Sequence, residues 1–485
     1  MKLSPCFFVF FFFFAAGSIF AAEQSQSPNI VVIFIDDMGY ADVGPFGGNV
    51  PTPNLDRLVA EGRRFTNFIV SSPVCSASRA ALMTGCYHRR VGISGALGPN
   101  ANIGLNPKEE TLAEICKKKG YATAIFGKWH LGHHPEFLPL SQGFDEYFGL
   151  PYSNDMWPLH PDIVKLPPDA AARKRSFPPL HLIEGTTPQE EIVTPEIQKT
   201  LTTQYTERAV RFIEKNQDKP FFLYLPHSMV HVPIFVSDKF AGKSHVGLFG
   251  DVIMEIDWSV GQITETLRRL NLDKKTLVIF TADNGPWLSY GNHAGSAGVL
   301  REGKGTSFEG GVREPMIAWL PGRIPAGTET DQLASTIDIL PTVAKLIDAP
   351  LPENKIDGKD VRPLLFDEPG AKSPHDAFPI YFNQQLQAVR DSRWKLVLPH
   401  QYRTMQGQKS GENGTPGVYS QKQVKLALYD LQNDISETTD VSGEHAEIMQ
   451  RLQNAAKAYL EELGERNRQG YGVRPVGKHE ENPKE

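Results

Sequence analysis

The chain has 485 residues but only four cysteines, and one of them lies in the apolar segment at its start. The other three, Cys75, Cys86 and Cys116, are too few and too odd in number for a disulfide framework. At most Cys86 and Cys116 could pair, which would leave Cys75 reactive or modified. The chain also lacks a basic excess, because its formal net charge is −6. We therefore expect no nucleic-acid partner and no stable membrane association.

Long apolar runs are also absent, apart from one segment near the start. Lys2 gives a positive beginning, a short apolar run follows, and small residues come at Ala21–Ala22, as in a secretory signal peptide over residues 1–22. The run is shorter than a comfortable membrane span, so an uncleaved anchor is the less favoured alternative. We expect a secreted or periplasmic protein, lysosomal if the source is eukaryotic; only there would the sequon at Asn413 matter.

Apolar runs that predict buried strands alternate with helical patterns over most of the chain. This alternation is typical of an α/β sandwich with a large, mostly parallel central sheet flanked by helices. We assign residues 23–370 to this catalytic domain and residues 371–485 to a C-terminal subdomain with antiparallel strands, a closing helix and a loose tail. The predicted strands cover 29–37, 65–72, 220–233, 276–285, 378–399 and 424–434, and a further strand begins at residue 121. The predicted helices cover 52–62, 76–85, 111–120, 204–216, 251–272 and 444–463. Residues 406–418 are predicted to form a surface loop.

Oxygen-bearing side chains follow two of the buried strands. Asp36 and Asp37 end the first, and Asp283 and Asn284 end another. Hard divalent cations such as Ca²⁺ or Mg²⁺ prefer such ligands. Each pair alone also suits a helix cap or a turn, but two pairs at strand ends favour a metal site.

Basic residues recur at the same strand ends. Arg79, Lys128 and Lys304 lie in CSASR, FGKWHLG and EGKGTSFEGG, and His130 and His231 lie close to them or at another strand end. Singly, such residues are usually solvated or structural. Together with a metal, they suit a tetrahedral oxyanion substrate, because cations stabilise charge on its oxygens and histidine transfers protons.

Cys75 itself allows several interpretations. At the start of a helix it could be a thiolate nucleophile of a Cys–His hydrolase, or simply a small buried apolar residue. The run CSASRAALMTG, however, resembles the sulfatase signature, whose core is Cys, any residue, Pro or Ala, any residue, Arg, and then Thr-Gly. The blocks IDDMG, TPNLD, GKWHLG, LPYSND, TADNGP and GKGTSFEGGVREP resemble this family in order, and SRWKLV to ETTDV resembles its C-terminal segment. The nearest branch is that of arylsulfatase A and N-acetylgalactosamine-6-sulfatase.

The resemblance implies an alkaline-phosphatase-like fold and a sulfatase that hydrolyses aryl or carbohydrate sulfate monoesters. It also implies that Cys75 is converted to formylglycine by a maturation enzyme during export. One Ca²⁺ would be held by the residues that match the family's metal ligands, namely Asp36, Asp37, Cys75, Asp283 and Asn284.

Roles for the basic residues follow from the same resemblance. Arg79 and Lys128 match groups that hold the formylglycine, and Lys128 and Lys304 match sulfate contacts. His130 matches the residue that handles the proton of the covalent intermediate. His231 matches a sulfate-binding histidine near the leaving group, with His227 a weaker candidate, and Ser153 matches a sulfate or formylglycine contact.

Three points remain open in the sequence. A phosphoesterase of the same fold and an inactive glycan-binding protein are alternatives. Position 77 is Ala, where Pro is more usual in the family, and this difference bears on how efficiently Cys75 is converted to formylglycine. The insert at 151–203 is expected to shape the pocket rim; its Arg173, Lys174 and Arg175 form either a solvated basic loop, which we favour, or contacts to a polyanionic substrate.

Overall fold

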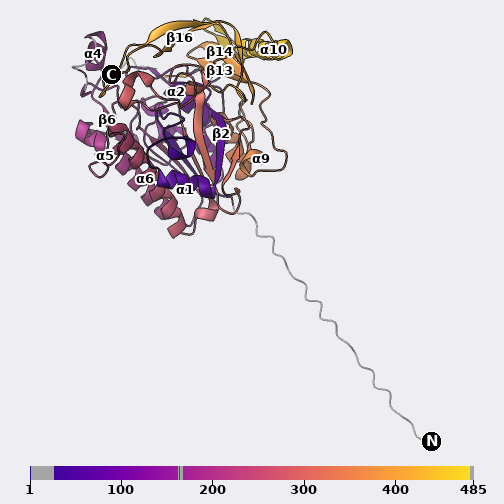
Figure 1. Ribbon diagram of the computed structural model, residues 1–485. Helices are drawn as coiled ribbons and strands as arrows, with labels where there is room; N and C mark the ends of the chain where they lie inside the picture. Colours follow the sequence, from indigo (N-terminus) through magenta and orange to yellow (C-terminus); the bar gives the residue numbers. More distant parts are fainter. Residues whose placement is uncertain (2–26, 162, 164–165, 167, 481–485) are drawn as a thin grey trace.

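The computed structural model describes residues 1, 27–161, 163, 166 and 168–480 (Figure 1). The predicted signal peptide, except Met1, lies outside the described residues. Among those that are described, no helix combines the length and apolar character needed to cross a bilayer.

A large mixed sheet forms the centre of the molecule. Its middle strand, β1 (Asn29–Ile35), is buried throughout and pairs in parallel with β8 (Phe221–His227) and β9 (Thr276–Ala282). Across the sheet the strand order is β11-β2-β10-β9-β1-β8-β4-β5-β6-β7, with β12 also beside β2. The other strands are β2 (Arg63–Ile69), β4 (Ala122–Phe126), β5 (Glu146–Gly149), β6 (His181–Glu184), β7 (Thr187–Ile192), β10 (Arg313–Trp319), β11 (Thr328–Thr330) and β12 (Ala334–Ser335). The predicted fold class is confirmed, although β10 was not predicted and runs antiparallel to β2 and β9.

Helices cover both faces of the sheet because successive side chains of β1 point to opposite sides. Val31 and Ile33 pack toward α1 (Pro53–Glu61), α5 (Pro195–Lys215) and α6 (Leu248–Arg269), which lie together at the lower left of the folded body in Figure 1. Ile30 and Val32 pack toward α2 (Cys75–Thr84), α3 (Leu112–Lys117) and α8 (Ile339–Leu346). The short helices are α4 (Pro168–Arg175), α7 (Glu309–Val312) and α9 (Arg362–Leu365).

A smaller antiparallel sheet carries the C-terminal part of the chain, as predicted. It consists of β13 (Phe378–Phe382), β14 (Gln385–Arg390), β15 (Trp394–Val397) and β18 (Ala427–Asp430). Helix α10 (Ala446–Leu463) shares a core with this sheet, and both lie at the top of Figure 1 above α2. The segment 406–418, predicted as a loop, joins a hairpin that we did not predict, formed by β16 (His400–Thr404) and β17 (Ser420–Val424).

The chain after α10 packs back on the body instead of forming the loose tail that we expected. β19 (Gly464–Glu465) pairs with β20 (Arg468–Gln469), and β21 (Gly477–Lys478) pairs with β3 (Ile103–Gly104). Between these strands Arg474 forms an ion pair with the buried Glu109 at 2.7 Å. These long-range contacts order residues 464–480, which the charged and Pro/Gly-containing sequence did not indicate.

Candidate functional site

The candidate site lies at the carboxyl ends of the central parallel strands. β1 leads into Asp36, β4 into Lys128, β8 into the loop that bears His231, and β9 into Asp283. β2 runs in the same direction and leads to Cys75, the first residue of α2. Ligands of open α/β sheets bind at this edge, where the strand order brings distant residues together. The structure therefore collects the predicted side chains from segments far apart in the sequence.

Backbone conformation at the site is unusual at two positions. Asp37 has φ of 60° and His130 has φ of 64°, values that non-glycine residues seldom adopt. Such conformations cost free energy and persist where the surrounding structure holds them, often at functional sites. Each lies in the loop that follows a buried strand, Asp37 after β1 and His130 after β4.

Asp36 and Lys128 form the first buried ion pair of the site. The Lys128 Nζ atom donates to Asp36 Oδ2 at 2.5 Å and to Ser153 Oγ at 3.3 Å. Burial raises the pKa of the Asp36 carboxyl, but the charges of Lys128, His231 and Arg79 outweigh burial and leave that pKa below its usual value. Asp36 is therefore an anion in the folded protein.

Asp37 organises the other half of the site. It accepts hydrogen bonds from Lys304 Nζ on Oδ2 and from Asn284 Nδ2 on Oδ1, both at 2.8 Å. His231 Nε2 lies 3.5 Å from Asp37 Oδ2 and 3.5 Å from Ser153 Oγ. Burial lowers the pKa of Lys304, but Asp37, together with Cys75 and Asp36, outweighs burial and raises that pKa above its usual value. Lys304 therefore contributes a permanent positive charge.

Arg79 ties the Cys75 helix to two strand ends. Its Nε and Nη2 atoms donate to Asp283 Oδ2 at 3.0 and 2.8 Å, and its Nη1 donates to the Lys128 carbonyl at 2.8 Å. Asp283 Oδ1 also accepts from the Asp37 backbone N–H at 3.1 Å. This buried fork links α2, β4 and β9 through charge-assisted hydrogen bonds.

Cys75 and His130 lie within this charged environment and are both buried. Burial raises the pKa of the Cys75 thiol, although Lys128 and Lys304 oppose the shift. Burial, with the positive charges of Lys128 and Arg79, lowers the pKa of His130 well below its usual value. His130 is therefore a neutral imidazole, and Cys75 is not held as a thiolate.

The site contains groups that could hold a metal ion. Ligand atoms of Asp36, Asp37 and His231 lie within 4.8 Å of one another, so the structure offers an Asp-Asp-His cluster. Asp36 Oδ1 and Asn284 Oδ1 are buried and have no hydrogen-bond partner among the described residues. Buried oxygens are seldom left unsatisfied, and these two fit a hard cation. The sequence analysis had placed Asn284 in the ligand set but had not placed His231 there.

Two expectations change with the structure. His227 lies away from the cluster, because its Nε2 is 3.1 Å from Ser259 Oγ on α6 and its ring packs near Tyr205. Lys174 is not part of a solvated loop: it lies on α4, is 5% exposed, and donates to Asp155 Oδ2 at 3.1 Å. Asp155 lies 19 residues before Lys174, so no periodic pattern in the sequence indicated this contact.

Two residues near the site were missed by the sequence analysis. Burial raises the pKa of the Asp155 carboxyl, but Lys174 and His231 outweigh burial and lower it below its usual value. Trp287 places its ring 4.5 Å from Lys304 Nζ and 5.6 Å from the His231 ring. Asp155 is the last residue of the block PYSND and Trp287 directly follows the block TADNGP, so membership of, or proximity to, these blocks was the available signal.

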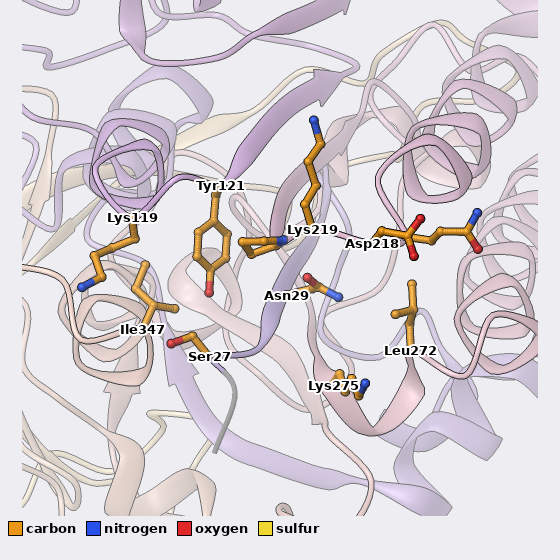
Figure 2. Close-up of a pocket in the computed structure, with 11 residues that line it drawn as sticks. Ser27, Asn29, Lys119, Tyr121, Asp218, Lys219, Leu272, Lys275 and Ile347 are labelled. Atoms are coloured by element: carbon orange, nitrogen blue, oxygen red, sulfur yellow. The ribbon is translucent and has the colours of Figure 1, made fainter. Parts of the chain in front are cut away.

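A separate cavity lies at the opposite, amino-terminal ends of the strands (Figure 2). It has a volume of about 490 Å³ and is lined by Asn29, Lys119, Tyr121 and Lys219, among other residues. Asn29 is already engaged there with Thr276 at 3.3 Å and with the Phe221 backbone N–H at 3.2 Å. This cavity contains none of the predicted site residues.

Comparisons with known proteins agree with the geometry. The sequence model of the family named Sulfatase matches residues 28–349, and that of the C-terminal region of aryl-sulfatase matches residues 373–476. Arylsulfatase A of Homo sapiens is 39% identical over 450 residues, covering 88% of this chain and 87% of its own. N-acetylgalactosamine-6-sulfatase of Canis lupus familiaris is 41% identical over 364 residues, covering 71% and 67%. The crystal structure of the PsFucS1 sulfatase from Pseudoalteromonas sp. superposes with a TM-score of 0.82 at 28% identity, covering 94% and 93% of the two chains.

Proposed function

Because the chain belongs to the sulfatase family and is a sulfuric ester hydrolase, we propose that it cleaves aryl or carbohydrate sulfate monoesters. In this proposal residue 75 is formylglycine, and one Ca²⁺ is bound beside Asp36 and Asp37. The observation that carries the proposal is the position of Cys75, which begins α2 beside buried carboxylates and lysines.

The thiol form of Cys75 does not suit the chemistry of a cysteine hydrolase. Burial raises its pKa, whereas a cysteine nucleophile needs a lowered pKa to act as a thiolate. This favours a modified residue 75 over a Cys–His hydrolase. Formylglycine would supply geminal hydroxyls, one to attack sulfur and one whose deprotonation releases sulfate.

Calcium is the cation that the donor set fits best. Asp36, Asp37, Asp283 and Asn284 offer oxygen atoms, and such ligands favour Ca²⁺ or Mg²⁺ over softer metals. The unsatisfied Asp36 Oδ1 and Asn284 Oδ1 support a bound cation. Ca²⁺ accepts irregular geometry with many oxygens, as a cluster drawn from separate loops provides. When bound, it would polarise the reacting oxygens.

His130 is placed to accept a proton at a defined atom. Its Nε2 lies 2.8 Å from the Leu97 carbonyl oxygen, so Nε2 must carry the hydrogen. The other nitrogen, Nδ1, is then a free lone pair, and it is buried without a partner among the described residues. The lowered pKa keeps this imidazole neutral at physiological pH. We assign the base for residue 75 to His130 Nδ1.

The remaining side chains bind the sulfate group and stabilise charge on the leaving oxygen. Lys128, which pairs with Asp36, and Lys304, which pairs with Asp37, neutralise the negative charge on the sulfate oxygens. His231 donates from Nδ1 to the Val232 carbonyl at 2.6 Å, which leaves Nε2 facing Ser153 and Asp37. In this position Nε2 can take a hydrogen bond from, or give a proton to, the departing alcohol.

Two alternatives are weaker. A phosphoesterase of the same fold usually has a second metal or a Ser or Thr nucleophile, whereas residue 75 is Cys in an intact CSASR run. An inactive glycan-binding protein would be expected to lack Cys75 or a carboxylate of the cluster, and these residues are present.

Two parts of the proposal concern the cell rather than the site. We propose export through the segment at 1–22, to the cell exterior, the periplasm or, in a eukaryote, the lysosome. A formylglycine-generating or equivalent enzyme would act on Cys75 before folding, since Cys75 is 2% exposed in the folded chain. The cell fraction that contains the protein, and its N-terminal residue, test the first point.

The deciding experiment is mass spectrometry of the tryptic peptide FTNFIVSSPVCSASR from exported protein. An aldehyde in place of the Cys75 thiol supports the proposal. Rates on matched aryl sulfate and aryl phosphate then separate a sulfatase from a phosphoesterase. Cys75→Ala should fold normally and lose turnover; activity equal to that of the unsubstituted protein would refute the assigned nucleophile.

A further inference from the structure

Trp287 lies at the boundary between the buried site and the solvent. Its ring is 4.5 Å from Lys304 Nζ and 5.6 Å from the His231 ring, the two groups that we place beside the leaving oxygen. The residues before it, Gly285 and Pro286, are buried, whereas Trp287 is partly exposed. One portion of the indole therefore packs on the site and another remains open to a ligand.

A second partly exposed residue completes this rim from a different part of the chain. Arg403, on β16, places its guanidinium 6.0 Å from the Trp287 ring and 4.7 Å from the Tyr419 ring. Its Nε donates to the Lys304 carbonyl at 3.1 Å, and Nη2 contacts the same oxygen. The hairpin β16–β17 thus reaches across to the loop that carries Lys304.

Arg403 has no salt-bridge partner within residues 27–161, 163, 166 and 168–480. The neighbours of its guanidinium are two aromatic rings and a carbonyl rather than a carboxylate. By contrast, Arg393 on the same subdomain pairs with Asp430 at 2.7 Å. A guanidinium of this kind, next to a substrate site, suits an anionic group of the substrate.

We propose that Trp287 and Arg403 form a rim subsite for an acidic sulfated saccharide. The sugar ring that carries the scissile sulfate stacks on Trp287, and a second anionic group, on that ring or the next one, pairs with Arg403. An aromatic face with polar and charged neighbours binds the apolar face of a sugar while its hydroxyls remain hydrated. Lys304 belongs to both sites, since its Nζ faces the sulfate site and its carbonyl holds Arg403.

The subsite rests on the proposed function, and steady-state kinetics test the two separately. Mature protein is assayed on three substrates: a monosulfated N-acetylhexosamine, whose sulfate is its only charge, a disulfated disaccharide and a monosulfated disaccharide with a uronic acid. Inorganic sulfate serves as a competitive inhibitor that reports only the sulfate site. Comparing the last two substrates shows whether a sulfate or a carboxylate is preferred at Arg403.

Trp287→Ala should raise KM about tenfold for all three saccharides, while Trp287→Phe retains most of the affinity. Inhibition by inorganic sulfate should change much less than KM for the saccharides in both variants. Arg403→Gln should raise KM more for the two substrates with a second anionic group than for the monosulfated N-acetylhexosamine. Trp258→Ala is the matched control, because Trp258 is also partly exposed beneath a lysine, Lys239, at 4.2 Å, but lies on α6.

The outcomes are distinct. Unchanged KM values in Trp287→Ala, or an equal loss of sulfate inhibition, would overturn the subsite and leave the sulfatase assignment intact. An Arg403→Gln effect of equal size on all three saccharides would remove the anion preference. If the unsubstituted protein with formylglycine at residue 75 hydrolyses none of them, the proposed function fails for saccharides and the subsite fails with it.

Discussion

Two regions of this molecule bury acidic and basic side chains together, but they satisfy them differently. Where the C-terminal subdomain meets the large sheet, Glu309 receives Arg313 and Arg390 on Oε2, both at 2.6 Å, and Lys395 on Oε1 at 3.0 Å. Both oxygens of that carboxylate are used. At the candidate site the ion pairs are equally close, yet Asp36 Oδ1 remains without a hydrogen-bond partner among the described residues.

The difference separates a structural clamp from a ligand site. Buried ion pairs contribute to a fixed arrangement when each group is satisfied within the protein, and losing one partner is then costly. An unsatisfied oxygen on a buried carboxylate that stays ionised, as on Asp36, instead indicates a group that the chain holds for a ligand. Charge density alone does not distinguish Asp36 from Glu309; the hydrogen-bond partners of their carboxylate oxygens do.

The largest expected effect breaks the clamp. Glu309→Gln leaves Arg313, Arg390 and Lys395 with one negative partner fewer and should lower the free energy of unfolding by about 3–5 kcal/mol. Denaturant unfolding measures this loss.

Glu314 provides the matched control for this variant. It is fully buried in β10 and neither carboxyl oxygen has a described partner. Burial, with the carboxylates of Asp283 and Asp37, raises the pKa of Glu314 well above its usual value, so the group is protonated. Glu314→Gln should therefore cost little. Equal losses in Glu309→Gln and Glu314→Gln would contradict the clamp.

The next effect concerns activity. Lys304→Met removes a cation that faces the sulfate and should lower kcat/KM by about 10²–10³. Its effect on stability should be smaller than that of Glu309→Gln, because Asp37 keeps other polar neighbours. Lys395→Met is the counterpart in the clamp, where stability should fall and kcat/KM of the folded fraction should not. The reverse pattern would refute the assignment of the two regions.

Calcium should sharpen the comparison by stabilising only one region. Ca²⁺ at about 100 times its Kd should raise the free energy of unfolding by about 2.7 kcal/mol, and a chelator should remove the gain. Asp36→Asn should abolish this response, whereas Glu309→Gln should keep it on a lower baseline. A calcium response retained in Asp36→Asn, followed by thermal unfolding, would place the cation elsewhere.

Acid should weaken the contact between the two subdomains through His88. This residue is fully buried, with Nε2 3.4 Å from the Asn383 carbonyl and its ring packed near Tyr381. Burial lowers the pKa of His88 from 6.5 to about 3. Below pH 6.5 the unfolded chain therefore binds a proton at His88, whereas the folded chain does not. The contribution of neutral His88 to the free energy of unfolding is fully present above pH 6.5 and is lost as the pH falls toward 3.

Between pH 8 and pH 5 this effect should amount to about 2 kcal/mol. His88→Phe should reduce the pH dependence of denaturant unfolding by that amount. His375 is the control, since it pairs with Asp338 at 2.8 Å and His375→Phe removes a different histidine of the same interface. An unchanged slope in His88→Phe would show that another group causes the acid sensitivity.

Sequence patterns predicted those parts of the fold and site that depend on local order. The central strand at Asn29–Ile35 reads as a continuous apolar run because both its faces are buried, and the polar residues after it follow directly. The helix that begins at Cys75 was also predicted from its local sequence. Motif blocks then identified residues whose types match one chemistry, and the structure brings them together.

What the sequence did not predict depends on pairings between distant segments. β10 contains the charged Arg313 and Glu314, so it does not read as a buried strand, although tertiary contacts bury it completely. The clamp at Glu309 needs partners from β14 and β15, beyond any local pattern. Arg403 likewise reaches the Lys304 loop across 99 positions of sequence.

The smallest expected effect tests whether α4 is an ordered part of the rim. Lys174 anchors that helix through Asp155, whereas Arg175, the next residue, is exposed. Lys174→Met should increase local opening of residues 168–175 by about 1 kcal/mol, seen as faster hydrogen exchange there, with the global stability unchanged. Arg175→Met removes the same charge without the contact and should leave exchange as it was. Only a buried ion pair at Lys174 makes the two substitutions differ in their effect on exchange. Equal exchange in both variants would therefore contradict that ion pair and support the solvated basic segment that the sequence predicted.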